Sequence, residues 1–388
     1  MEFFDLIIIG SGITGLSAAK AFAETSGNKK ILILNGEDRL PYKRTEITKN
    51  IEKGFSKEEF SLFEKYKDYG FWVQAKAAVI DYQHRTLSLT NKKEYTWKTL
   101  ILATGATAKK VYNPKSHVIR TALDGESLLQ KARGSRSAAI IGGGVLAVET
   151  AVQLRNLGLA VNIYLQKSRL LEDSFTPFMS DHLDTLLRSE KIKIEYNHTI
   201  NQVDDSAQGF TIRSSSENRL FDLVTECAGS IPNTELCGKD MIRVNKGIVV
   251  DSFMQTSYKG VFAAGDCTEF LGIDVCKLWH QAEDQGLQAG KNAALFLQGK
   301  PMEEFPDRKR RMKLEVFGQY YYSQNYSSNT EYDKSIKSHK NNIYEEFHFK
   351  NNILSAITMT GNKTRAKEYE QALWKNWPIT KLKETFLS

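Results

Sequence analysis

Two glycine-rich stretches of this sequence have the residue types needed to bind a dinucleotide. The first reads GSGITG at residues 10–15, and the second reads GGGVLA at residues 142–147. In such a turn the first glycine makes the bend, the second lets the backbone approach a pyrophosphate, and a small third residue lets the helix pack on the strand. The pyrophosphate then faces the positive end of that helix. The predicted phosphate-binding residues are Gly10, Gly12 and Gly15 in the first turn and Gly142, Gly144 and Ala147 in the second.

The residue at the end of the next strand after each turn helps to determine which nucleotide is bound. Glu37 lies 22 residues after Gly15, where a carboxylate can hold ribose hydroxyls, although a solvent-exposed turn glutamate is the alternative. The second turn has no such acid, because its strand ends in Leu165-Gln166-Lys167. Lys167 and Arg169 could instead bind a 2′-phosphate through charge-assisted bonds. This pattern favours NADPH, while Gln166 could hydrogen-bond a ribose and leaves NADH open.

The elements around both turns are those of a doubly wound α/β fold. Residues 3–37 read as an apolar strand, the turn, a helix with small residues on one face, and a second strand, and the pattern returns over residues 137–166. Two such βαβ starts imply two Rossmann-like, three-layer nucleotide-binding domains. From about residue 307 the sequence changes to short strand-like runs rich in Tyr, Phe, Lys and Asn, which predicts a small C-terminal α+β domain.

Composition narrows the functional class. The chain of 388 residues is 41% hydrophobic and 26% charged, and its first apolar run is too short for a membrane span or a signal peptide, so we expect a cytoplasmic protein. Four cysteines without a CxxC pair indicate buried thiols in a reducing compartment and no metal site. They are Cys227, Cys237, Cys267 and Cys276.

The net charge of +7 is partly gathered in DRKRRMK at residues 307–313. This segment is either a solvated turn or a basic rim that steers an acidic protein partner. Nothing in the sequence resembles a nucleic-acid-binding module.

Six motifs in register carry a resemblance to a known family. They are GSGITG, LPYKRTEITK, LILATGA, IIGGGVLAVE, GSIPNTEL, and GVFAAGDCTEF followed by LWHQAEDQG. In this order they resemble the FAD-dependent pyridine nucleotide oxidoreductases. More narrowly, the chain is similar to the rubredoxin and ferredoxin reductases and to the flavin part of assimilatory nitrite reductase. The resemblance covers roughly residues 3–300, and the C-terminal part matches only loosely, around MKLEVFG.

The resemblance implies a role for each motif. The first turn would bind the FAD pyrophosphate, with Glu37 on the ribose, and the second would bind NAD(P)H. A Lys49–Glu149 pair would lie near the face of hydride transfer as the catalytic pair; without the resemblance, Glu149 reads as a helix-surface residue. The remaining flavin-contacting residues would be Arg44, Lys49, Thr104, Gly105, Gly265, Asp266 and Trp279. Thr45 and Glu46 depart from the prolines that the family often has there, and Pro232 and Asn233 match a structural crossover.

The implied architecture is a split FAD domain (1–108 and 232–306), an inserted NAD(P)H domain (109–231) and a C-terminal interface domain (307–388). No cysteine precedes residue 227, which argues against thiol–disulfide or sulfenate chemistry. We therefore expect hydride transfer to the flavin, then single electrons to a small acidic carrier such as rubredoxin or ferredoxin. The alternatives are a flavoenzyme acting on a quinone, oxygen or, within an assembly, nitrite, and a flavin-binding redox sensor. We expect a monomer or a homodimer.

Overall fold

The computed structural model describes most of the chain: residues 1–54, 60–215, 217–238, 240–270, 275, 278–306, 310–340, 343–361 and 363–387. Cys276 and residues 307–309 of the basic segment lie outside the described residues. The chain forms two compact units. The first consists of Met1–Glu46, Ser56–Thr107 and Ser230–Arg308, and the second of Ile47–Phe55, Ala108–Gly229 and Lys309–Ser388.

A mixed sheet forms the centre of the first unit. Its order is β3-β2-β1-β6-β5-β4, with β17 also paired to β6. The parallel strands are β1 (Glu2–Ile9), β2 (Ile31–Asn35), β3 (Phe71–Gln74), β6 (Glu94–Leu102) and β17 (Val261–Ala263). The antiparallel strands are β4 (Ala77–Asp81) and β5 (Thr86–Leu89). The parallel strands are apolar because this sheet is covered on both faces.

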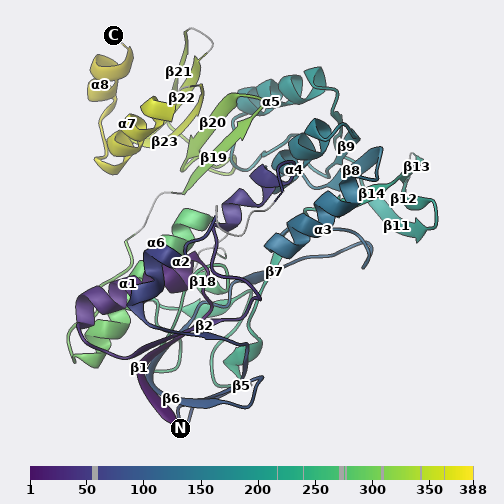
Figure 1. Ribbon diagram of the computed structural model, residues 1–388. Helices are drawn as coiled ribbons and strands as arrows, with labels where there is room; N and C mark the ends of the chain where they lie inside the picture. The colour runs from purple at the N-terminus through teal and green to yellow at the C-terminus, as the bar shows by residue number, and fades with distance from the viewer. Residues whose placement is uncertain are drawn as a thin grey trace. The chain divides into compact units, whose positions relative to one another are not determined.

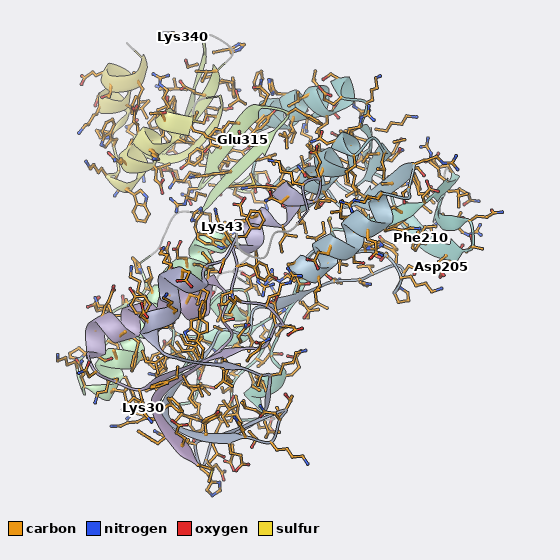
Figure 2. All side chains as sticks on the ribbon, in the orientation of Figure 1. Lys30, Lys43, Asp205, Phe210, Glu315 and Lys340 are labelled. Carbon is orange, nitrogen blue, oxygen red and sulfur yellow. The ribbon has the colours of Figure 1, made fainter. Side chains whose placement is uncertain are left out.

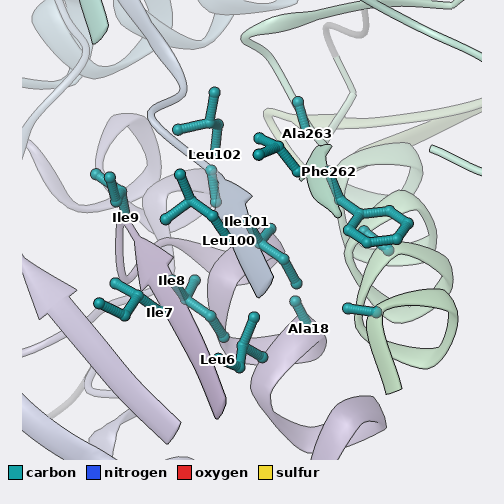
Figure 3. Close-up of a cluster of buried hydrophobic side chains, with 14 of the residues drawn as sticks. Leu6, Ile7, Ile8, Ile9, Ala18, Leu100, Ile101, Leu102, Phe262 and Ala263 are labelled. Carbon is teal, nitrogen blue, oxygen red and sulfur yellow. The ribbon is translucent and has the colours of Figure 1, made fainter. Parts of the chain in front are cut away.

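Two helices pack together in the first unit, α1 (Ile13–Ser26) and α6 (Trp279–Leu297), and they lie side by side (Figure 1). Glycines on α6 permit the contact: a Cβ on Gly286 would lie 2.3 Å from the carbonyl oxygen of Thr14, and one on Gly290 would lie 2.1 Å from that of Ala18. Side chains from β1, β6, β17 and α1 form the core (Figure 3). This packing fixes the direction of α1, and with it the first glycine turn.

Shorter elements complete this part of the chain. The helix and strands are α2 (Phe63–Tyr66), β7 (Ala106–Ala108), β15 (Ser230–Pro232), β16 (Ile248–Val250) and β18 (Thr268–Phe270). The 3-10 turns are η1 (Arg44–Glu46), η3 (Lys67–Tyr69) and η4 (Glu235–Cys237). Strands β16 and β18 form a parallel pair.

The second unit contains a second parallel sheet, of order β10-β9-β8-β14. Its strands are β8 (Ser137–Ile141), β9 (Ala160–Tyr164), β10 (Lys193–Glu195) and β14 (Leu223–Glu226). An antiparallel sheet accompanies it, with β11 (Ile200–Ser206), β12 (Gly209–Ser214) and β13 (Asn218–Phe221). The helices are α3 (Ala122–Ala132), α4 (Val145–Asn156) and α5 (Pro177–Ser189), and the 3-10 turn η2 (Thr48–Asn50) packs on α4. The prediction of two Rossmann-like βαβ starts is confirmed.

The C-terminal part of the second unit is a five-stranded antiparallel sheet of order β19-β20-β23-β22-β21. Its strands are β19 (Arg311–Val316), β20 (Gln319–Gln324), β21 (Lys334–Lys340), β22 (Ile343–Lys350) and β23 (Ile353–Thr360). It is followed by α7 (Lys363–Trp374), α8 (Ile379–Leu382) and a last turn over Lys383–Leu387. Figure 2 labels Glu315 on β19 and Lys340 at the end of the edge strand β21. This arrangement has the α+β character predicted for the C-terminal residues, which here belong to the second unit.

Polar and aromatic contacts join this sheet to the rest of the second unit. The Nδ1 atom of His182 on α5 lies 2.8 Å from the hydroxyl of Tyr321, and Ser323 Oγ donates to the carbonyl oxygen of Ser174 at 2.5 Å.

In the described part of the chain, none of the helices combines the length and the apolar character needed to cross a bilayer.

Candidate active site

The first glycine turn has the geometry of a phosphate cradle. Gly10 has a φ of +113°, and a Cβ there would lie 2.2 Å from the carbonyl oxygen of Ala103; a Cβ on Gly15 would lie 1.9 Å from that of Gly10. Around Gly12, in contrast, nothing lies within 4 Å of such an atom, and Gly12 precedes α1 without a side-chain cap. The first amides of α1 therefore stand behind an open, small-residue turn, which fits a pyrophosphate.

Glu37 is held in place beside this turn. The hydroxyl of Tyr42 donates to its carboxylate at 2.8 Å, and Arg44 forms an ion pair with it. A second link runs through Asn35, whose Oδ1 accepts from the backbone N–H of Glu37 at 3.3 Å and from Ser11 Oγ, within the turn, at 2.9 Å. The carboxylate predicted for the ribose is thus connected to the turn predicted for the pyrophosphate, and Arg44 lies at that end of the site.

Asp266 is brought to the same region by its neighbour Gly265. Gly265 has a φ of +79°, and a Cβ there would lie 2.3 Å from Thr14 Oγ1 on α1. Its N–H donates to Gln285 Oε1 on α6 at 2.8 Å. Burial lowers the pKa of Arg44, but the charges of Glu37 and, more weakly, Asp266 help to hold that pKa above its usual value. Asp266 therefore acts electrostatically on the same cation that Glu37 binds.

Thr104 and Gly105 follow β6 and are tied to the returning chain at Asn233. Thr104 Oγ1 donates to the carbonyl oxygen of Asn233 at 2.7 Å, and Asn233 Nδ2 donates to that of Thr104 at 2.9 Å. The N–H of Asn233 donates to the carbonyl oxygen of Gly105 at 3.0 Å. Asn233 thus fastens the crossover segment to the end of the strand that was predicted to meet the cofactor.

Trp279 begins α6 and is half-buried. It packs with Ile13, Leu62 and Ala282. The ammonium of Lys43, labelled in Figure 2, lies 6.0 Å from the centre of its ring and 2.9 Å from Glu46. The side chain is therefore positioned by α1 and by the segment that carries Arg44.

The second glycine turn repeats the geometry of the first within the second unit. Gly142 has a φ of +132°, and a Cβ there would lie 2.5 Å from the carbonyl oxygen of Cys227. Gly144 precedes α4 without a side-chain cap and has nothing within 4 Å of an added Cβ, while Ala147 is fully buried. This turn also fits a pyrophosphate.

Glu149 on α4 meets the segment that carries Lys49. The hydroxyl of Thr48, which is 3% exposed, donates a hydrogen bond to the Glu149 carboxylate, and Lys49 is the next residue. The backbone N–H of Glu52 donates to Gln153 Oε1 on α4, and Asn156 Nδ2 donates to the Glu52 carboxylate, both at 3.1 Å. Residues 47–55 therefore belong to the second unit, although the residues on either side belong to the first.

Lys167 and Arg169, the predicted 2′-phosphate ligands, follow β9. Each already has a carboxylate partner: Lys167 pairs with Asp173, and Arg169 Nε lies 3.2 Å from Asp181. Neither acid was predicted from the sequence; Asp173 and Asp181 follow Lys167 and Arg169 by 6 and 12 residues.

The cysteines in the part of the chain that the structure describes are all free thiols. Burial raises the pKa of Cys227 and of Cys237 to about 12, and it also raises that of Cys267. These thiols are therefore protonated at neutral pH and poorly suited to thiolate chemistry. Among the described residues, no group of three His, Cys, Asp or Glu side chains could hold a metal ion.

The profile of the pyridine nucleotide-disulphide oxidoreductase family matches residues 4–286. The chain belongs to this family. Both nucleotide turns, Glu37 and Asp266 fall within the match. Membership confirms the prediction of an FAD-dependent NAD(P)H oxidoreductase at the level of the family, and the chain has the two cradles that such an enzyme requires.

Three relatives are about a quarter identical to this chain over the aligned residues. The nitric oxide reductase FlRd-NAD(+) reductase of Aliivibrio fischeri is 26% identical over 69% of this chain and 73% of its own length. The rubredoxin-NAD(+) reductase of Ectopseudomonas oleovorans is 27% identical over 68% and 71%. The assimilatory nitrate reductase electron transfer subunit of Bacillus subtilis is 25% identical over 94% of this chain, which spans about half (48%) of that protein.

Solved structures share the fold. A ferredoxin reductase from Rhodopseudomonas palustris superimposes with a TM-score of 0.87 at 20% identity, over 98% of this chain and 96% of its own. This likeness covers the C-terminal sheet as well as the two nucleotide-binding parts.

Proposed function

We propose that this chain is an NAD(P)H-dependent flavoprotein reductase that passes electrons to a small acidic carrier protein such as rubredoxin or ferredoxin. The observation that carries the proposal is the pair of open glycine turns, at Gly12 and at Gly144, each in front of an uncapped helix. Bound FAD supplies the chemistry, by accepting a hydride from the nicotinamide and releasing electrons one at a time. The chain supplies binding, orientation and charge.

The proposed division of labour has three parts. Residues 1–108 and 232–306 hold FAD, with the first turn at the pyrophosphate, Glu37 at the ribose, and Arg44, Thr104, Gly105, Asp266 and Trp279 along the rest of the cofactor. Residues 109–231 hold NAD(P)H at the second turn. Lys49 and Glu149 serve hydride transfer as a charged pair, and Thr48 positions the carboxylate. Residues 307–388 form the docking domain.

NADPH is the proposed donor. The loop after β9 offers no carboxylate to a 2′-hydroxyl at Leu165 or Gln166, and it presents Lys167 and Arg169. KM values for the two donors test this proposal: a lower KM for NADPH is expected, and a clear preference for NADH contradicts it.

The electron acceptor is tested by reoxidation. After anaerobic reduction, the protein is mixed in a stopped-flow instrument with rubredoxin, ferredoxin, quinone or oxygen. Rapid reoxidation by one of the iron–sulfur proteins is expected. Reoxidation by oxygen as fast as by any protein carrier contradicts the proposal.

We also place the protein in the cytoplasm, because reduced, buried thiols persist in a reducing compartment.

One observation favours a second acceptor class, a nitrite- or nitrate-reducing assembly. The match to the Bacillus subtilis electron transfer subunit extends over 379 residues and so includes the C-terminal sheet, whereas the match to the rubredoxin-NAD(+) reductase covers 278 residues. Copurification with a larger reductase subunit from the native organism would support this class.

A further inference from the structure

The loop that follows β9 is built into the second glycine turn. The N–H of Leu171 donates to the carbonyl oxygen of Gly143 at 2.9 Å, and a Cβ on Gly143 would come within 2.5 Å of Leu165 Cδ1. Leu165 and Leu171 are both buried, so they anchor the two ends of the loop. Residues 166–169 are exposed or half-buried between these anchors, so they lie at the rim of the turn, where the adenosine ribose of a dinucleotide is held.

Two cations of this loop are paired with two exposed carboxylates. The side chains are 49% and 65% exposed in the Lys167–Asp173 pair, and 41% and 66% exposed in the Arg169–Asp181 pair. Ion pairs this exposed contribute little to stability because water and salt screen them. A phosphate dianion forms stronger charge-assisted bonds with Lys and Arg, so it can displace either carboxylate.

We propose that Asp173 and Asp181 are specificity-determining residues that set the discrimination between NADPH and NADH by occupying Lys167 and Arg169. The inference rests on the proposed function, in which the second turn binds the donor nucleotide. A 2′-phosphate that binds the two cations competes with both carboxylates for their N–H donors, whereas NADH leaves the two pairs intact. The two acids therefore weaken NADPH binding selectively and keep NADH usable.

Glu172 provides a matched control within the same loop. Its carboxylate accepts a hydrogen bond from Ser168 Oγ at 2.6 Å, and it makes no ion pair with Lys167 or Arg169 among the contacts of the described residues. Glu172→Gln changes the net charge by the same amount as Asp173→Asn or Asp181→Asn. A comparison of the three variants separates release of a cation from a general change of charge.

The experiment uses the FAD-loaded protein and two probes, 2′,5′-ADP and 5′-AMP, with dissociation constants measured by isothermal titration calorimetry. These probes differ in the phosphate under test and involve no turnover. We expect each Asp→Asn substitution to tighten binding of 2′,5′-ADP about 2- to 5-fold, and the double variant about 10-fold. Binding of 5′-AMP should change by less than about 2-fold, and Glu172→Gln should affect neither probe by more than that.

The outcomes separate the inference from the function on which it rests. If the wild-type protein binds both probes but the double variant binds 2′,5′-ADP no more tightly, the inference is wrong and the nucleotide site stands. The inference is also wrong if Glu172→Gln gives the same gain, because net charge then explains it. If the wild-type protein binds neither probe, the proposed nucleotide site itself is wrong. Circular dichroism and flavin content confirm that each variant is folded.

Discussion

The hydroxyl of Thr48 donates a hydrogen bond to the carboxylate of Glu149, which lies 101 residues away in the sequence. With the contacts of Glu52 to Gln153 and Asn156, this bond joins residues 48–52 to α4. Lys49 and Glu149 are thereby carried by one unit of the protein. Their relative placement is set by that unit alone and does not depend on how the flavin-binding strands are arranged.

Substitution of Thr48 tests this positioning role. In Thr48→Val the half-buried carboxylate of Glu149 loses a donor while the shape of the Thr48 side chain is kept. We expect the anaerobic rate of flavin reduction by NADPH to fall about 10-fold or more, because a hydrogen bond to a charged group is worth about 1.5–3 kcal/mol. Thr48→Ser keeps the hydroxyl and should restore most of the rate. Equal rates in Thr48→Val and wild type would show that the bond is only structural.

The Glu37–Arg44 pair predicts how tightly FAD is held. Glu37→Gln removes the ribose carboxylate and the ion pair between Glu37 and Arg44, so we expect FAD affinity to fall about 10-fold or more. Tyr42→Phe removes one neutral donor to Glu37 and should cost less, about 2- to 5-fold. Titration of the apoprotein with FAD measures both. Unchanged affinity in Glu37→Gln would mean that this carboxylate does not contact the cofactor.

The contact between α1 and α6 predicts a stability effect without any cofactor. A Cβ at Gly290 would clash with the backbone of Ala18, so Gly290→Ala should destabilise the first unit by about 2–3 kcal/mol despite its better helix propensity. Gly134, which follows α3, has only one atom within 4 Å of an added Cβ, at 3.9 Å, and Gly134→Ala is the matched control. Thermal unfolding of the apoprotein compares them. A similar melting temperature for both variants would contradict the packing.

The C-terminal sheet should be sensitive to acid through His348, which is 3% exposed and has no hydrogen-bond partner at Nε2. Burial lowers its pKa to about 4. A histidine whose pKa is depressed by folding contributes stability above its unfolded pKa of about 6.5, and this contribution is lost as the pH falls toward 4. The loss should reach up to about 3 kcal/mol across that range.

Urea unfolding as a function of pH measures this loss. His348→Gln should flatten the decline between pH 6.5 and 4. An unaltered slope in His348→Gln would show that other groups carry the acid sensitivity.

The features that could be predicted from the sequence are those determined by residues close together in the chain. The two glycine turns, the apolar strands before them and the small residues at the third turn position are each fixed by backbone sterics within a few residues. Glu37 could be placed because one helix and one strand of typical length separate it from the first turn. These predictions depend on spacing alone.

Features that depend on a partner distant in the sequence could not be predicted in the same way. Nothing near Thr48 indicates that it meets Glu149, and the ties between Asn233 and Thr104 follow from the return of the chain. Lys167 and Arg169 were correctly read as cations after β9. Their pairing with Asp173 and Asp181 depends on the path of the loop and of α5, which periodicity does not describe.

Anaerobic mixing of the FAD-loaded protein with NADPH or NADH tests directly whether the protein transfers a hydride from NAD(P)H to its flavin. The flavin absorbance near its visible maximum should bleach with both donors and faster with NADPH, and prior alkylation of all accessible thiols should not alter the rate. Absence of bleaching with both donors would contradict the proposed reductase function. Bleaching that is lost when the thiols are blocked would contradict a mechanism without thiol chemistry.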